Sequence, residues 1–405
     1  MKIIRSSKCS LKYATKSKQQ ELQKVLTEYG KVVNIFINYF WEHKTKKTEL
    51  LKDIFNLPDT WLSGRLKQVA AREALDMVNS VQEVFEWNKE QLFDSITSIE
   101  NKIEEIKTRK NTRENKRKIN GLHCKLKKKK MKYDMVQPHK PKHKGKRMCI
   151  SALIGKLEEP KETNEFNAWL HLSSIGNKIN IDLPINYHKH FKELNKKGRR
   201  LNSYIITENN VQFSFEIETG LKKEVRHLIG VDTGINALAS TSDNKQFGLD
   251  IKENIEKIKR CKWGSKGHKR ASKTLKYKIS EIAKKVAQEA DLVVVENLKN
   301  LSKNTKLKQR LSKNMRCSIG SWNYRYWLMR LEQQCENNRV SFRTVSPYYT
   351  SQICSACGYT DKRNRNNELF SCQSCNYTGN ADINAALNIL SRFLTGKYGS
   401  CYKAA

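Results

Sequence analysis

The feature that most constrains the fold of this chain is a pair of Cys-x-x-Cys motifs in the last sixth of the sequence. The four cysteines are Cys354, Cys357, Cys372 and Cys375. Each motif supplies two sulfur atoms from one tight turn, so the pair can close a tetrahedral site for a metal that prefers thiolates. Paired spacing with polar turn residues argues against four unrelated buried cysteines. We therefore predict a structural Zn²⁺ site that organises the surrounding chain.

The charge of the chain indicates a polyanionic partner. Lys and Arg number 78 against 41 acidic residues, a formal net charge of +37. Such an excess opposes compaction unless a polyanion neutralises it, so we expect nucleic acid. A membrane partner is not expected, because we find no apolar run of transmembrane length, no signal peptide and no lipidation motif. The other seven cysteines show no paired spacing, which favours a reducing, cytoplasmic compartment.

A helical pattern covers the region that follows the first 15 residues. Apolar residues recur at steps of three and four from Lys16, and again from about Thr60. Between Glu100 and Met148 there are 19 Lys or Arg residues against 5 acidic ones. This run is either a solvated charged hairpin or an arm that neutralises phosphates. We favour the arm, because an uninterrupted block of lysines repels itself when free.

The residues expected to contact nucleic acid lie in this run and in the basic linker that follows it, residues 140–148. They are Lys127, Lys128, Lys129, Lys130, Lys144 and Arg147. Aromatic residues are sparse here, so neutralisation of the phosphate backbone is expected rather than base stacking. His139 and His143 lie at this linker, and we expect both to be solvated rather than to bind a metal.

From Cys149 the period of the pattern changes to two. Strands are predicted over residues 168–173, 178–183, 203–208 and 211–218, with a hairpin turn at Asn209–Asn210. They indicate a small β-rich domain, for which a barrel is one possible form. This part of the chain contains no catalytic constellation.

A third region begins at His227. Its expected order is three strands, a basic helical segment over 251–290, a buried strand, a helix over about 319–337 and another strand. The cysteine motifs and a last helix over 383–394 then follow. This is the element order of a ribonuclease-H-like α/β domain.

Three carboxylates stand at informative points of that region. Asp232 lies within a strand, Glu296 ends the buried strand, and Asp382 lies where the last helix begins. If the sheet brings them together, they form an oxygen-rich pocket for hard divalent cations. Two Mg²⁺ ions about 4 Å apart can activate water and stabilise the leaving oxygen of a phosphodiester. The pattern therefore predicts magnesium-dependent hydrolysis.

Each acid also has an ordinary explanation. Asp382 alone suits the N-cap of a helix, and Glu296 alone suits the end of a buried strand. Asp232 lies in Asp-Thr-Gly, which aspartic proteases also carry, but a protease needs a second such aspartate and the chain has none. The order of the three acids, with the cysteine motifs just before the third, favours the metal site.

These motifs resemble those of a known family. GVDTGINALASTSD, VVVENLKNL and the stretch from SPYYTSQICSACGY to NADINAALNIL are similar to the RuvC motifs and zinc finger of TnpB, and LTGKYGSCYK to its C-terminus. TnpB proteins are transposon-encoded, RNA-guided DNA endonucleases related to compact type V CRISPR effectors. By resemblance, Asp232, Glu296 and Asp382 fall on the catalytic acids and the four cysteines on the zinc ligands. Asn380 departs from the pattern, since TnpB commonly has an aspartate there.

The resemblance implies a multidomain protein of mixed α and β structure. Its expected parts are a wedge-type β-barrel (1–15 and 141–226), a helical recognition lobe with the basic arm (16–140), a RuvC-like nuclease domain (227–350), a zinc ribbon insertion (351–379), the final RuvC helix (380–395) and a tail (396–405).

The function implied is RNA-guided cleavage of DNA, with structural Zn²⁺ and catalytic Mg²⁺. Guide RNA and target DNA are the expected partners, and a monomer is favoured over a dimer. The alternative is a non-cleaving, RNA-guided DNA-binding protein that acts like a repressor, in which the acids are structural.

Overall fold

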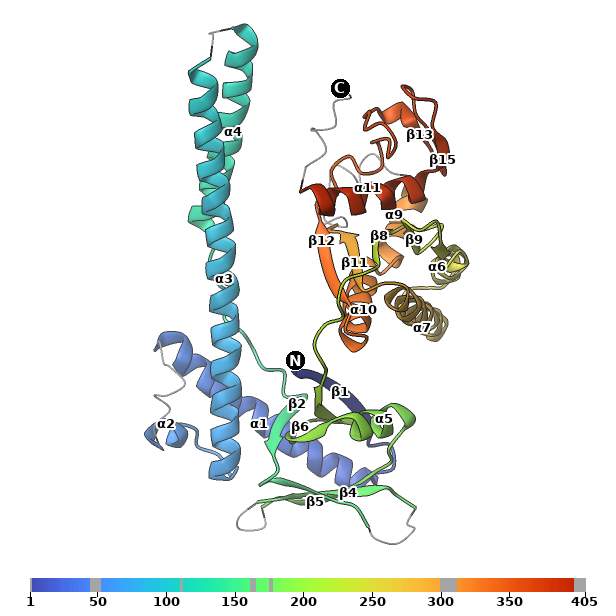
Figure 1. Cartoon of the computed structure of the whole chain (residues 1–405). Coiled ribbons are helices and arrows are strands. Elements are labelled where there is room, and N and C mark those ends of the chain that lie inside the picture. The colour runs from blue at the N-terminus through green and yellow to red at the C-terminus, as the bar shows by residue number, and fades with distance from the viewer. Residues whose placement is uncertain are drawn as a thin grey trace. The chain divides into compact units, whose positions relative to one another are not determined.

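The chain divides into two compact units, which we describe separately. A computed structural model describes residues 2–43, 52–109, 112–160, 165–174, 178–298 and 312–396. The N-terminal unit is Lys2–Glu218, and the C-terminal unit begins at Thr219 (Figure 1). Both contain helices and strands, so the predicted mixed class is confirmed at this level. The expected tail lies beyond Gly396, outside the described residues, and none of the described helices is long and apolar enough to cross a membrane.

Helices make up most of the N-terminal unit. They are α1 (Lys16–Glu42), α2 (Lys52–Asn56), α3 (Gly64–Lys107), α4 (Arg113–Met135) and α5 (Lys189–Lys197). Helix α1 begins where the side chain of Thr15 accepts a hydrogen bond from the Lys18 amide, as Ser and Thr do at helix N-caps. It packs against α3 through a continuous apolar face that includes Leu26, Phe36 and Leu66.

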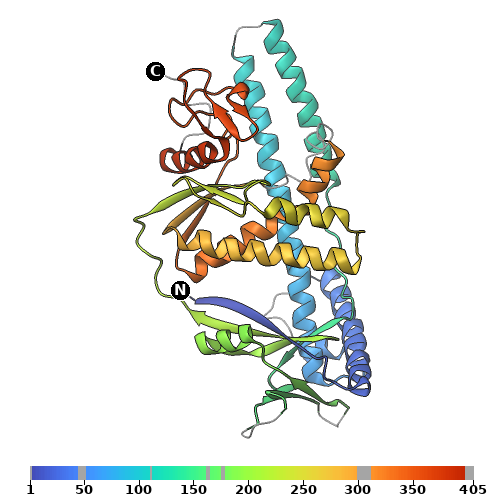
Figure 2. The same ribbon diagram turned by 90° about the vertical axis from the view of Figure 1, so that its right-hand side faces the viewer.

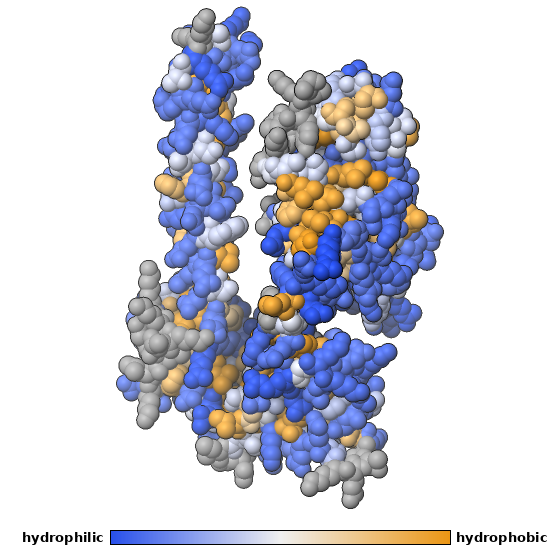
Figure 3. All heavy atoms as spheres, in the orientation of Figure 1, coloured by the Kyte–Doolittle hydropathy of each residue, from blue (hydrophilic) through white to orange (hydrophobic). Residues whose placement is uncertain are grey.

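A long helical hairpin is formed by α3 and α4, which run side by side (Figures 1 and 2). Helix α4 has no buried residue, and Figure 3 shows hydrophilic residues covering most of the visible face of the hairpin. Its helicity is supported by a cap at Thr112, whose side chain accepts a hydrogen bond from the Asn115 amide, and by contact with α3.

The strands of this unit form two antiparallel sheets. One has the order β1 (Lys2–Ser10), β7 (Asn210–Glu218), β6 (Arg199–Thr207), β2 (Arg147–Ser151); the other has β3 (Gly155–Glu158), β4 (Ala168–Ser173), β5 (Asn180–Ile185). All four strands predicted from the period of two are present. The hairpin turn between β6 and β7 falls one residue earlier than expected, at Glu208–Asn209. Apolar residues of both sheets share one core with α1 and α3.

The segment 140–148 is not the simple solvated linker that was expected. His143 is buried, because both its backbone groups bond the amide side chain of Asn34, at 3.0 and 2.8 Å, against α1. Gly145 has φ +64° and lies so close to Gly30 that a Cβ on Gly30 would stand 2.4 Å from the Gly145 Cα. The close approach of two glycines holds this segment against α1. The prediction of a solvated His143 is therefore wrong.

One five-stranded sheet is the centre of the C-terminal unit. Its order is β10 (Gln246–Phe247), β9 (Ala239–Thr241), β8 (Leu228–Asp232), β11 (Leu292–Glu296), β12 (Ser341–Val345). Strands β8, β11 and β12 are parallel, whereas β8, β9 and β10 pair antiparallel. The helices are α6 (Ile251–Arg260), α7 (Lys266–Gln288), α9 (Lys313–Ser321), α10 (Tyr324–Asn337) and α11 (Ala381–Thr395).

Two expected helices are each divided in the structure. The basic segment 251–290 breaks between α6 and α7, where Gly264 has φ +77°, a conformation that residues with a Cβ rarely adopt. The segment 319–337 breaks between α9 and α10 at Asn323, which has φ +53°. Apolar residues at helical spacing occur on both sides of each break, so the expected segments were each taken as one helix.

Both faces of the sheet are covered by helices. In β11, Val293 and Val295 pack into the core that contains α6, α7 and α10. Leu292 and Val294 point the other way and pack with Ile389 of α11. Alternate residues of a strand point to opposite faces, so Glu296 lies on the face that α11 covers. The same counting from Leu228, which also packs with this cluster, puts Asp232 on that face.

Candidate active site and metal centre

The parallel register of β8 and β11 brings two of the three predicted acids together. Leu228 to Val231 pair with Leu292 to Val295, so the next residues, Asp232 and Glu296, stand side by side where the two strands end. Asp232 is half-buried, and Glu296 is buried. The carboxyl ends of parallel strands are the edge at which α/β proteins commonly place functional groups.

The third acid, Asp382, lies in the first turn of α11. The helix is capped by Asn380, whose side-chain oxygen accepts hydrogen bonds from the amides of Asp382 (2.9 Å) and Ile383 (3.1 Å). Asn380 therefore performs the capping that the sequence alone would assign to Asp382. The Asp382 carboxylate is left to point over the turn that follows β8, where a Cβ built on Gly234 would lie 3.6 Å from its Oδ2.

Gly230, in the middle of β8, is what allows α11 to approach the sheet. A Cβ at this position would lie 2.2 Å from the carbonyl oxygen of Ala386 and 2.8 Å from the amide of Leu390. Both are backbone atoms, which cannot rotate away as a side chain can. The sequence placed a glycine here within GVDTG, but no pattern in the sequence showed which helix it faces.

We predict that Gly230→Ala displaces α11 and destabilises the C-terminal unit by about 1–3 kcal/mol, the usual cost of overpacking a core. Thermal or denaturant unfolding of the full chain measures this loss. Gly320→Ala in α9 is the control, since nothing lies within 4 Å of a Cβ there and its φ is not in the left-handed region. An equal loss in the two variants would show that the contact with α11 is unimportant.

The carboxyl group of Asp232 lies close enough to the other two acids for their charges to affect its pKa. Burial raises the pKa of Asp232 well above its usual value, and the nearby charges of Glu296 and Asp382 raise it further. Burial likewise raises the pKa of Glu296, although a hydrogen bond from Thr350 lowers it in part. Gathering like charges in a buried place costs free energy unless cations compensate. The site therefore favours bound positive charge.

Several residues that the sequence did not single out support the acids. The Arg365 guanidinium lies 2.6 Å from the Asp382 carboxylate, and the Thr350 hydroxyl donates to Oε1 of Glu296. The Tyr324 hydroxyl donates to the Glu296 carbonyl at 2.7 Å and accepts from the Leu298 amide at 3.2 Å. Arg365 lies in a two-residue strand and Thr350 in a turn, and both stretches are too short for periodicity, so no sequence signal distinguished them.

The four cysteines form a compact cluster, with all four sulfur atoms within 4.8 Å of one another. Two of the Sγ–Sγ distances are 3.7 Å (Cys354–Cys375) and 3.6 Å (Cys357–Cys372). A tetrahedron with Zn–S bonds of about 2.3 Å has edges of about 3.8 Å, so the cluster fits zinc. Among the described residues these four cysteines are the only group of His, Cys, Asp or Glu side chains gathered so tightly, and the three carboxylates do not form such a group.

The two halves of this cluster share one local geometry. The Cys354 amide bonds the carbonyl five residues ahead, at Tyr359, and the Cys372 amide does the same at Tyr377. The residue after each second cysteine has a positive φ, +76° at Gly358 and +56° at Asn376. A sheet of β13 (Arg365–Asn366), β14 (Leu369–Ser371) and β15 (Thr378–Asn380) completes the segment, which we call the cysteine ribbon.

Buried asparagines join the cysteine ribbon to α11. The Asn388 amide nitrogen donates to the carbonyls of Thr350 (2.9 Å) and Ile353 (2.7 Å). Asn384 donates to Ile353 at 2.8 Å and accepts from the Ser355 amide at 2.9 Å. The first cysteine turn is thus attached to the helix that carries Asp382. A buried amide without a hydrogen-bond partner costs free energy, so these contacts hold the ribbon against α11.

The predicted nucleic-acid contacts stay predictions, and the structure shows where they lie. In α4, Lys127, Lys128 and Lys130 are exposed and Lys129 is half-buried. Lys130 forms an ion pair with Glu100 of α3 at 2.7 Å. Lys144 is exposed. Arg147 contacts the buried carboxylate of Glu73 at 2.9 Å, so it has a structural partner besides any contact with phosphate.

The C-terminal unit thus combines a mixed five-stranded sheet, three acids at one edge and a cysteine ribbon before its last helix. This arrangement is a mixed α/β fold with a cysteine cluster, able to hold a metal ion, just before its last helix. Residues 324–389 match the family model described as Cas12f1-like, TNB domain. The match covers the helix before the ribbon, all four cysteines and most of α11.

Known proteins share stretches of this chain. The putative RNA-guided DNA endonuclease InsQ of Escherichia coli is 27% identical over 214 residues, which are 45% of this chain and 52% of the relative. A TnpB-like protein of Aquifex aeolicus is 33% identical over 126 residues, 29% of this chain and 40% of the relative. A Cas12f1 endodeoxyribonuclease of Sulfoacidibacillus thermotolerans is 38% identical over 72 residues, 18% and 17% of the two chains.

These matches span about half or less of the relatives' own lengths. A structural neighbour extends over nearly the whole fold: CasPhi-2 (Cas12j) bound to crRNA and phosphorothioate-DNA has a TM-score of 0.51, with 11% identity over 98% of this chain and 92% of that one. The resemblance to TnpB and compact type V CRISPR effectors, predicted from the motifs, is confirmed.

Proposed function

We propose that this chain is an RNA-guided DNA endonuclease that hydrolyses phosphodiester bonds at a RuvC-like site. The observation that carries the proposal is that Asp232 and Glu296 end neighbouring parallel strands, with the charge of Asp382 near enough to raise the pKa of Asp232. The relatives named as RNA-guided or CRISPR-associated endonucleases support the same reaction and the same partners, guide RNA and DNA.

The proposed catalytic group is the set of three carboxylates, which would hold two Mg²⁺ ions. When bound, the ions supply Lewis acidity that activates water and stabilises the leaving oxygen. The protein's part is to fix the carboxylates in place: the strand register sets Asp232 and Glu296, and the Asn380 cap sets Asp382. The Arg365 guanidinium adds positive charge beside Asp382, where it can also contact a phosphate.

The remaining parts are assigned by the same proposal. The cysteine ribbon holds structural Zn²⁺ through Cys354, Cys357, Cys372 and Cys375. Residues 16–140 act as the recognition lobe, and residues 1–15 and 141–226 as the wedge-type β-barrel. The lysines of α4 would neutralise the backbone of guide RNA or of its duplex with DNA, while base pairing supplies sequence choice.

The proposal is tested with the full chain purified together with co-expressed RNA. Sequencing that RNA gives the guide, and DNA targets with randomised flanks are then offered in the presence of Mg²⁺. We expect cleavage that requires the matching target and a permitted flank, and that EDTA abolishes. Guide-dependent binding of DNA without any metal-dependent product would instead establish the alternative, a non-cleaving binder.

A further inference from the structure

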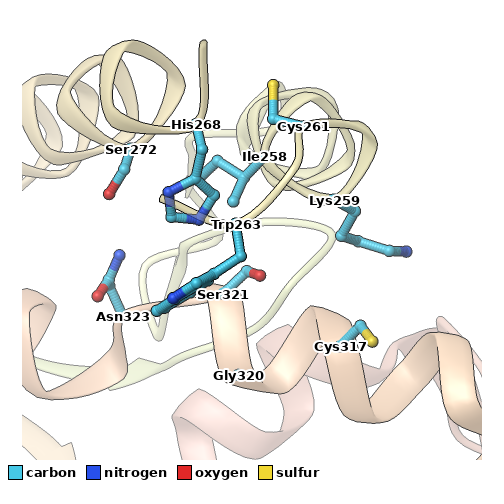
Figure 4. Close-up of a pocket in the computed structure, with 10 residues that line it drawn as sticks. All are labelled: Ile258, Lys259, Cys261, Trp263, His268, Ser272, Cys317, Gly320, Ser321 and Asn323. Carbon is cyan, nitrogen blue, oxygen red and sulfur yellow. The ribbon is translucent and has the colours of Figure 1, made fainter. Parts of the chain in front are cut away.

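A pocket of about 810 Å³ opens in the C-terminal unit between the α6–α7 turn and α9 (Figure 4). Its walls include Trp263 from the turn, His268 from α7, Cys317 and Ser321 from α9, and Asn323 from the break before α10. None of these residues belongs to the proposed catalytic set. The size of the pocket is in the range that small organic groups occupy in proteins.

Trp263 is the notable residue of this pocket. Its side chain is large and apolar, yet the residue is 86% exposed. Figure 4 shows the indole extending from the turn towards the α9 side of the pocket, with the His268 ring above it. The two ring centroids are 4.6 Å apart and tilted by 54°. A tryptophan needed only for packing would be covered, so this open ring is available to a ligand.

The chain around the pocket is strongly cationic. Residues 257–278 contain ten Lys or Arg residues and no acidic residue. Two of these lysines have partners outside the segment: Lys259 contacts Glu256 at 2.7 Å, and Lys278 contacts Asp250 at 3.1 Å. Lys262, Lys266 and Lys269 stand exposed on either side of Trp263. Positive charge interleaved with an open aromatic ring is the pattern of surfaces that bind single-stranded nucleic acid.

We propose that this pocket binds an unpaired nucleotide of a single-stranded nucleic acid, with the base stacked on Trp263 and the flanking phosphates on the lysines of the turn. The inference rests on the proposed function, and it adds a site outside the carboxylate set. A single strand is favoured over a duplex, because paired bases are stacked on each other and cannot enter a pocket. Stacking accepts any base, so little sequence preference is expected.

The wall of the pocket is next in sequence to a residue that contacts a proposed catalytic acid. Asn323 lines the pocket, and the next residue, Tyr324, donates its hydroxyl proton to the Glu296 carbonyl. A strand anchored at Trp263 would therefore be held on the same rigid unit as the carboxylates. Anchoring of this kind lowers the entropic cost of positioning a flexible substrate.

Binding of a labelled oligothymidylate to the full chain, followed by fluorescence anisotropy, tests the proposal. We expect Trp263→Ala to weaken binding about tenfold, the effect typical of losing one base–aromatic stack, and to leave binding of a duplex of equal length unchanged. Trp263→Phe should retain most of the affinity. Tyr277→Ala removes another aromatic residue of α7, 65% exposed and outside the pocket, and should have no effect.

A second measurement protects the proposal from a folding artefact. An iodouridine-containing oligonucleotide crosslinks on irradiation to aromatic side chains that touch the base, and the crosslinked peptide of the wild type should contain Trp263 or His268. Crosslinks only at other sites, or unchanged affinity of Trp263→Ala, overturn the inference. Guided cleavage by the wild type is measured separately. If the wild type cleaves and Trp263→Ala binds the oligonucleotide normally, only the inference fails. If the wild type does not cleave but binding depends on Trp263, only the proposed function fails.

Discussion

Asp232→Ala is expected to abolish guided DNA cleavage while leaving RNA and DNA binding intact. Asp232 is close to both other acids, since the charges of Glu296 and Asp382 both raise its pKa. Removing it takes away an oxygen ligand that no neighbour among the described residues replaces. A loss of about 4 kcal/mol of transition-state stabilisation, typical for a metal ligand, is about a thousandfold in rate. Single-turnover cleavage of a labelled target measures this effect.

Two control variants test whether the loss of cleavage comes from the charge of Asp232 and is specific to this site. Asp232→Asn keeps the shape of the side chain and removes its charge, so it should be nearly as inactive, which would separate charge from packing. Glu253→Gln changes an exposed acid on α6 and should cleave like the wild type. Retained cleavage by Asp232→Ala would contradict the proposed site. An inactive Asp232→Ala variant that also fails to bind guide RNA would instead indicate misfolding, which unfolding curves would reveal.

Replacing Cys354 and Cys357 together by serine is expected to release zinc and loosen the whole end of the C-terminal unit. Zinc binding supplies on the order of 10 kcal/mol in small zinc modules, and that free energy is folding free energy. Because Asn384 and Asn388 bond the same turn that carries these cysteines, the loss should extend into α11. Metal content by mass spectrometry and the melting temperature of the full chain measure the two effects.

The matched control is the double variant Cys124→Ser and Cys317→Ser, which changes two exposed cysteines outside the cluster. It should keep one zinc per chain. The Cys354/Cys357 variant should also lose cleavage, because Asp382 is carried by α11, whereas Asp232→Ala should lose cleavage and keep its zinc. Unchanged metal content in the Cys354/Cys357 variant would remove the zinc assignment.

Much of the C-terminal unit could be predicted because the sequence patterns that indicate it lie within short stretches of the chain. The spacing of four cysteines, the run of valines before Glu296 and the position of Asp382 each follow from a few neighbouring residues. The alternative explanation of Asp382 as an N-cap does not hold, and the reason is also local: Asn380, two residues earlier, makes those hydrogen bonds. Pattern alone cannot decide between two adjacent capping residues.

The features that were missed depend on contacts between distant residues. Arg365 reaches Asp382 only because the ribbon folds back over α11, and the burial of His143 depends on Asn34, 109 positions earlier. A charged or polar residue in an irregular stretch carries no periodic signal, so neither its burial nor its partner follows from sequence.

The place of the cysteine ribbon in the chain has a consequence for synthesis. Asp232 and Glu296 are made first, and the ribosome must then add the 86 residues that lead from Glu296 to Asp382, the ribbon among them, which takes roughly ten seconds. During that time the sheet edge holds two acids and no helix to cover them. Under the proposed mechanism a nascent chain, or one released early, is harmless to the DNA around it, and nuclease activity awaits both translation past Asp382 and the supply of zinc.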